Sequence, residues 1–170
     1  MKTSISVKSD LKDWESLKNK LLVSDDKELR IGFFQEDTYG PENNNLPVAA
    51  VAAWQDLGAP FNGPQHIPPR PFMRIGLRDI LKSKSMTDKY KETFTRALAN
   101  KGSLKLSYSG IAKTVVPELK KVIDDWTTPP NAPSTIEQKG KNDPLVDTGK
   151  MRDSVKAKIT TSVKHQRPLF

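Results

Sequence analysis

The apolar positions along most of the chain follow the period of either a helix or a strand. Spacings of three and four predict helices over residues 75–99, broken near 83–85, and over 108–126, where Pro117 should introduce a kink or mark the first turn. A shorter stripe follows a cap at Ser9 or Asp10 and ends before a turn at Ser24-Asp25-Asp26. The members of the two clearest stripes are Leu11, Trp14, Leu17 and Leu21, and then Ile111, Val115, Leu119, Val122, Ile123 and Trp126.

Strict alternation of apolar and polar residues predicts strands near 29–35 and 155–163, and a short strand near 5–7. Between them, Pro47 begins a helix of small residues that Gly58 ends. The expected fold class is α+β, with a small, mostly antiparallel sheet and helices packed on one face. One of the long loops is a possible source of an extra strand.

Three polar or proline-rich segments join these elements, near 36–46, 58–71 and 127–147. A length of 170 residues indicates one domain spanning 1–170. Loops of this length are unusual inside a compact domain unless they have a function. They carry apolar residues at intervals, which we expect to dock onto a neighbouring subunit: Phe61, Ile67, Phe72, Ile136 and Leu145.

Composition narrows the chemistry that the chain can support. There is no cysteine and there are two histidines, His66 and His165, so thiolate chemistry is excluded and little remains for a metal site. The longest apolar run, residues 46–54, is far shorter than the roughly 20 residues that a membrane-spanning helix requires. The first ten residues lack the apolar centre of a signal peptide, so we expect a soluble protein.

The net charge of +8 is unevenly distributed. Residues 31–69 have no Lys or Arg but contain Glu36, Asp37, Glu42 and Asp56, whereas residues 70–109 carry ten basic and three acidic side chains. One interpretation is nucleic-acid binding by the basic segment. The other is self-association, in which Glu36, Asp37 and Asp56 of one copy face the basic segment of the next. The basic segment has no aromatic platform and no recognition-helix pattern, which favours the second interpretation.

The triplet Asp147-Thr148-Gly149 could be an aspartic-protease motif or a turn that caps a short helix. An aspartic protease needs two carboxylates that share a proton. The triplet occurs once and is followed by Lys150-Met151-Arg152 in place of an apolar strand, which favours the turn. No other arrangement of residues indicates catalysis, a phosphate loop or a cofactor, so we expect a protein that is not an enzyme.

Four segments, read in order, resemble the bacteriophage tail-completion family, the neck or head–tail connector proteins of long-tailed phages. They are "VAAVAAWQDLGA", "IPPRPFMR", "TTPPNAPSTIEQKG" and "DPLVDTGKMRDSV", and the match runs from about residue 29 to 160. The chain departs from the family pattern at residues 55–59, where Gln-Asp-Leu-Gly-Ala stands for Asn-Glu-Phe-Gly-Thr, and at Met151. These departures leave open whether the chain is a tail terminator or a head-side neck ring.

The resemblance implies a structural virion protein without catalytic residues. It implies a homo-oligomeric ring of six or twelve copies, made in the bacterial cytoplasm, that contacts connector and tail-tube proteins, surrounds passing DNA and touches no membrane. At the ends of the proline-rich loops, we expect Pro71 to fix the path, Phe72 to be buried and Arg70 to pair with a carboxylate. We expect Gly149 to allow the turn, with the oxygen of Asp147 or Thr148 accepting free amides. The alternative function is a basic nucleic-acid-binding protein.

Overall fold

The computed structural model describes residues 27–59, 66–99 and 104–161. The strand expected near 5–7 and the helix expected after Ser9 or Asp10 lie outside the described residues. The described elements are, in chain order, β1 (Lys27–Gly32), η1 (Pro41–Asn43), α2 (Val48–Leu57), α3 (Phe72–Lys82), α4 (Lys84–Ala99), α5 (Leu104–Asp124), α6 (Pro133–Lys139), α7 (Lys150–Asp153) and β2 (Lys156–Thr161).

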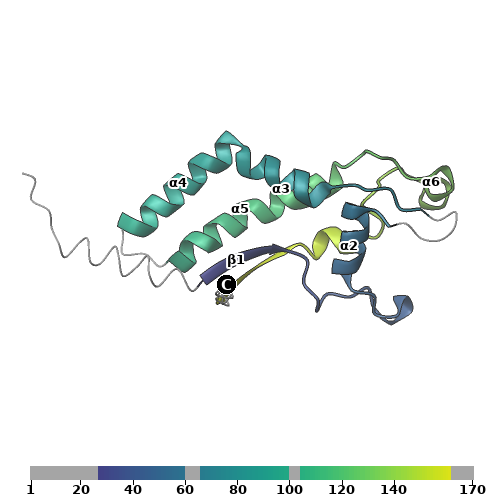
Figure 1. The fold of residues 1–170 in the computed structure, drawn as a ribbon, viewed down its shortest axis with the longest axis horizontal. Helices are drawn as coiled ribbons and strands as arrows, with labels where there is room; N and C mark the ends of the chain where they lie inside the picture. Colours follow the sequence, from purple (N-terminus) through teal and green to yellow (C-terminus); the bar gives the residue numbers. More distant parts are fainter. Residues whose placement is uncertain (1–26, 60–65, 100–103, 162–170) are drawn as a thin grey trace, which may run out of the picture.

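The fold is α+β, as the sequence predicted, and α5 is its central element. The β1–β2 ribbon lies on one side of α5, and α3 and α4 lie on the other (Figure 1). Helix α2, helix α6 and η1 gather at one end of the elongated molecule (Figure 1). The segment that follows β1 and the segment that precedes α7 also lie at this end (Figure 1).

The two strands are antiparallel, with Leu29 opposite Ile159 and Ile31 opposite Ala157. Because side chains alternate between the faces of a strand, these apolar residues share one face, and both strands contact α5. β1 is shorter than the predicted strand. It ends at Gly32, whose φ of 149° is a conformation that other residues rarely adopt, so Phe33 and Phe34 do not continue the pairing.

The helical periodicity predicted the core well. Ile111, Val115, Leu119 and Ile123 of α5 are buried. The predicted break falls at Ser83, whose hydroxyl donates to the Ile80 carbonyl and accepts the Met86 amide, so one side chain ends α3 and begins α4. The helix α5 begins well before Pro117, so the proline is internal and does not mark the first turn.

The segment 127–147 was expected to be an extended loop, and this was wrong for its centre, which forms α6. Pro133 occupies the first turn, where its missing N–H costs no hydrogen bond. Gly140 ends the helix with a φ of 68°. The proline and glycine that looked like loop signals are therefore the two ends of a short helix.

Candidate assembly surface

Arg70 links three segments that are distant in sequence. Its Nε donates to the Pro129 carbonyl at 2.9 Å, Nη1 to the Gln55 Oε1 at 2.6 Å, and Nη2 to the Pro130 carbonyl at 3.1 Å. We call this set of contacts the Arg70 clasp. The residue is only 4% exposed, and its burial lowers the pKa of the guanidinium.

The expected carboxylate partner of Arg70 is absent from the clasp, where all three acceptors are neutral oxygens. A buried cation is tolerated when its donors are all hydrogen-bonded to oriented dipoles. The carbonyls of Pro129 and Pro130 can supply this because both residues lie outside the helices and strands, where no regular backbone hydrogen bonding occupies these oxygens. The clasp therefore fixes the path of residues 129–130 against α2.

The two residues after Arg70 behave as predicted. Pro71 precedes the first residue of α3, and Phe72, which begins it, is fully buried. The Phe72 ring meets the Phe33 ring edge-on, with 6.2 Å between centroids. This contact joins the start of α3 to the segment that leaves β1.

Because Pro71 has no side-chain oxygen, the cap of α3 comes from elsewhere. Asp56, near the end of α2, accepts the Met73 amide at 3.0 Å and the Arg74 Nε at 2.8 Å. A carboxylate at a helix N-terminus satisfies a free amide and interacts favourably with the helix dipole. Asp56 is therefore a structural residue that fixes the angle between α2 and α3.

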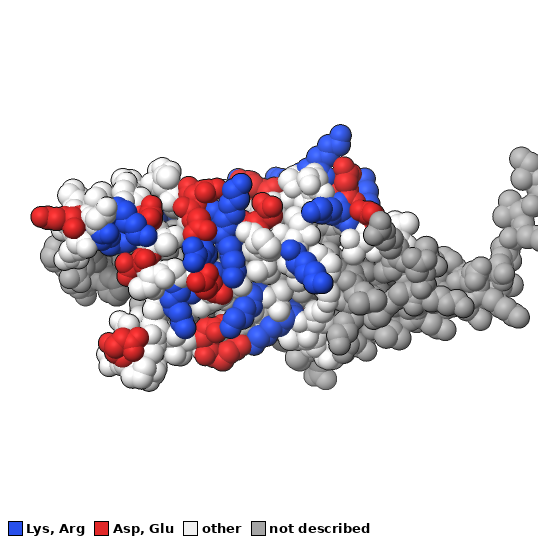
Figure 2. Space-filling view, turned by 180° about the vertical axis from the view of Figure 1, so that it is seen from behind, with Lys and Arg blue, Asp and Glu red and all other residues white. Residues whose placement is uncertain are grey.

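The other two acids also pair within the chain. Lys156 binds Asp37, with 2.5 Å between Nζ and Oδ1, and Lys158 binds Glu36. Glu36, Asp37 and Asp56 therefore do not form the free acidic face that was expected to meet a neighbouring copy. On the face in Figure 2, acidic and basic side chains are interspersed.

The Asp147-Thr148-Gly149 triplet forms the predicted turn. Gly149 has a φ of 81°, and the Thr148 hydroxyl accepts the Lys150 amide at 3.3 Å as α7 begins. Asp147 makes no contact of this kind within the turn. Its exposed carboxylate instead faces Tyr39 across a cleft. Burial raises the pKa of Tyr39, and the negative charge of Asp147 raises it further.

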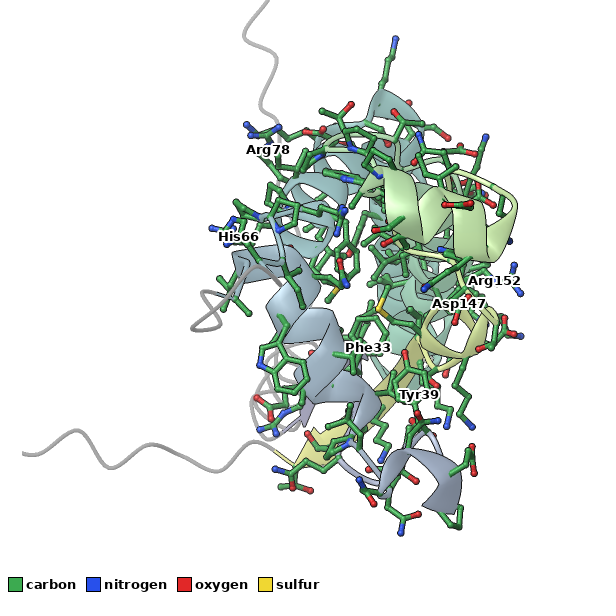
Figure 3. The ribbon with its side chains drawn as sticks, turned by 90° about the vertical axis from the view of Figure 1, so that its right-hand side faces the viewer. Phe33, Tyr39, His66, Arg78, Asp147 and Arg152 are labelled. Carbon is green, nitrogen blue, oxygen red and sulfur yellow. The ribbon has the colours of Figure 1, made fainter. Side chains whose placement is uncertain are left out.

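This α2–α6 cleft has a volume of about 730 Å³ and lies between α2 and η1 on one side and α6 and the start of α7 on the other. Tyr39 and Asp147 lie on the same side of the molecule, opposite His66 and Arg78 (Figure 3). Lys139 of α6 stabilises the α6 side of the cleft by donating to the backbone carbonyls of Asp143 and Val146, at 2.7 and 2.6 Å. Residues lining the cleft are Tyr39, Asn43, Leu46, Val51, Gln55, Asn131, Thr135, Gln138, Lys139, Pro144, Leu145, Asp147, Thr148, Gly149, Lys150 and Met151.

Among the described residues that line the α2–α6 cleft, Asp147 supplies the single carboxylate, beside Lys139 and Lys150. The cleft does not bring together two carboxylates that could share a proton, which an aspartic protease requires. Its mixture of amides, hydroxyls and apolar side chains suits contact with a polypeptide segment.

Of the apolar loop residues expected to dock onto a neighbouring subunit, Phe72 and Leu145 are instead buried in the core of their own chain. Ile67 is half-buried, and Phe61 lies outside the described residues. Ile67 and Ala59 exchange both backbone hydrogen bonds, at 3.1 and 3.3 Å. The ends of the 58–71 loop are therefore held together by this bridge, and Arg70 lies three residues after Ile67.

Sequence reasoning missed Gln55, Tyr39 and Lys139, which contribute polar groups to the cleft. Gln55 lies in a helix that looked notable for its alanines, and Lys139 in a segment expected to be a loop. Nothing in the residue types marked them. The one available signal was Pro133 followed seven residues later by Gly140, the boundaries of a short helix.

No family model, curated protein or solved structure matches this chain. Within residues 27–59, 66–99 and 104–161, no helix has both the length and the apolar character needed to cross a membrane. In the same ranges, no three His, Cys, Asp or Glu side chains group closely enough to hold a metal ion.

Proposed function

We propose that the chain is a structural, non-enzymatic virion protein that forms a ring at the phage neck or head-proximal end of the tail. Copies of the chain would join tail to head and complete the tail. The neighbours would be connector and tail-tube proteins, with DNA passing through the lumen. The order of the four motif segments supports this proposal.

One structural observation carries it further: the four segments meet at one end of the fold. Arg70 of "IPPRPF" donates to the two prolines of "TTPP" and to Gln55 of "WQDLG". The segment "DPLVDTG" lines the same cleft as Gln55 and Thr135. Residues that resemble one family's motifs thus build a single structural unit, in which polar groups serve to hold loops in place.

A surface built from loops that the fold already fixes in position suits assembly, because such loops lose little conformational entropy when a neighbour binds. Closed rings use a heterologous interface, in which one patch meets a different patch on the next copy. The α2–α6 cleft would be one such patch. A loop of the adjacent copy would be its occupant.

The test is electron microscopy and native mass spectrometry of the purified protein over a range of concentrations. The proposal expects closed rings of six or twelve copies, and immunogold labelling of virions at the head–tail junction. Gln138→Trp, which places a bulky ring in the cleft at an exposed position of α6, should prevent ring formation while the subunit stays folded. Lys113→Glu, an exposed change on α5, is the matched control and should leave rings intact.

A monomer at every concentration, with labelling absent from virions, would refute the proposal. Retention of DNA by that monomer with a steep salt dependence would support the nucleic-acid-binding alternative. In the described part of the basic segment, Arg74 and Arg78 already pair with Asp56 and Asp79. Such pairing reduces the positive charge available to phosphates.

A further inference from the structure

The loop between β1 and α2 folds into a short hairpin that projects from the end of the molecule (Figure 1). The Tyr39 amide donates to the Leu46 carbonyl at 3.0 Å, which joins the two sides of the hairpin. Its tip consists of residues 41–45, all of them exposed, and begins with the short helix η1. We call residues 41–45 the η1 tip.

Hydrogen bonds within the hairpin hold the η1 tip in one conformation. The Asn45 amide donates to the Gly40 carbonyl at 2.8 Å. The Asn44 amide donates to the Pro41 carbonyl at 3.0 Å. Asn44 and Asn45 have positive φ angles of 53° and 52°, which asparagine adopts more readily than most residues. A tip that is fixed in this way loses little conformational entropy when it enters a partner.

The charges of the η1 tip and of the α2–α6 cleft are complementary. Glu42 is the single charged residue of the tip, and Lys150 is an exposed residue that lines the cleft. Within the part of the chain that the structure describes, neither of them has an ion-pair partner. The other two charges of the cleft offset each other, since burial lowers the pKa of Lys139 and the nearby Asp147 carboxylate opposes that shift. Lys150 is therefore the cation that remains available to an incoming carboxylate.

We propose that the η1 tip of one copy occupies the α2–α6 cleft of the next copy, with Glu42 paired to Lys150. Within one chain the tip forms an edge of the cleft through Asn43 and does not fill it. Asn44 of the tip and Gln138 of the cleft carry carboxamides, which both donate and accept hydrogen bonds. Because the tip and the cleft are different patches of the same chain, the contact can repeat from copy to copy and close a ring. This inference rests on the proposed function, since it names the loop that fills the cleft.

The test reverses the charge on either side of this contact, in the variants Glu42→Lys and Lys150→Glu. Assembly is measured by sedimentation at low ionic strength, where charge interactions are least screened. Each variant places like charges across every interface, so we expect each to raise the protein concentration needed for half-assembly by about tenfold. The matched controls are Glu118→Lys and Lys113→Glu, exposed changes on α5 that should leave this concentration unchanged. Circular dichroism and urea unfolding check that every variant stays folded.

The decisive measurement is on an equimolar mixture of Glu42→Lys and Lys150→Glu. Copies of the two variants that alternate around a ring restore a pair of opposite charges at every interface. The mixture should therefore assemble at the wild-type concentration, into rings that contain both variants in equal numbers. Native mass spectrometry with one variant isotopically labelled counts them.

Two outcomes would overturn this inference and leave the proposed ring standing. In one, the wild-type chain forms rings and the single variants assemble equally well. In the other, the single variants fail to assemble and their mixture fails as well. A wild-type chain that stays monomeric at every concentration would rule out the proposed ring and this inference together.

Discussion

The Arg70 clasp allows a quantitative prediction, because one side chain joins α2, α3 and residues 129–130. The variant Arg70→Met keeps an unbranched stem in the same space but removes all the donors. Three acceptors, Gln55 Oε1 and the carbonyls of Pro129 and Pro130, lose their partner.

A hydrogen bond from a charged donor contributes about 1.5–3 kcal/mol. The sum over three bonds overestimates the loss, because removing the guanidinium also removes the cost of burying its charge. We therefore expect Arg70→Met to lower the free energy of unfolding by about 3 kcal/mol, a large part of the 5–15 kcal/mol typical of a domain. Arg70→Lys should recover little, since one ammonium cannot span three acceptors that match a planar fork.

Urea unfolding followed by tryptophan fluorescence and circular dichroism measures this loss, at several protein concentrations so that association is separated from folding. The matched control is Arg78→Met on the same helix. Arg78 is exposed and pairs with the adjacent Asp79, so its removal should change the free energy of unfolding by no more than about 0.5 kcal/mol. A loss below about 1 kcal/mol for Arg70→Met would refute the reasoning that the clasp holds these segments together.

Three further predictions concern local contacts. Gly149→Ala should cost about 1–2 kcal/mol of folding free energy, because φ is 81° and the new Cβ would lie 2.9 Å from Arg152 Nη2; an unchanged denaturation midpoint would contradict this. Because Lys158 donates to its carboxylate, Glu36 should titrate below its ordinary pKa of 4.5, so the pair stabilises the fold above that pH and ceases to do so as pH falls through the folded-state pKa. Lys158→Met should raise the Glu36 pKa in an NMR titration, and no movement would show that the pair is not formed. Asp56→Ala should lower the unfolding free energy by about 1–3 kcal/mol, because an amide at the start of α3 loses its acceptor, whereas Asp56→Asn should cost much less; equal losses would assign the role to the ion pair instead.

Local features of the fold could be predicted from the sequence because they depend on periodicity and backbone restrictions within a few residues. The stripe on α5, the break at Ser83 and the burial of Phe72 all follow from such patterns. The same holds for the turn at Gly149, where the missing side chain permits a positive φ. The helix α6 was missed since seven residues are too few to show a period.

The partners of the polar side chains were not predictable in this way. A charge pattern shows that acidic and basic segments attract, but not whether they meet within one chain or between two. The fold decides this for Asp56, which caps α3 and pairs with Arg74 of its own copy. It decides the same for Glu36 and Asp37, because the antiparallel pairing of β1 with β2 brings Lys156 and Lys158 beside them.

Arg70 shows the physical reason most directly. The sequence determined that a cation lies between two prolines, at the end of a loop and before a buried phenylalanine. Two of its three acceptors are backbone carbonyls, a group that every residue carries, so no residue type marks them in the sequence. Only the tertiary structure, by placing residues 129–130 against α2, decided which oxygens the guanidinium would bind.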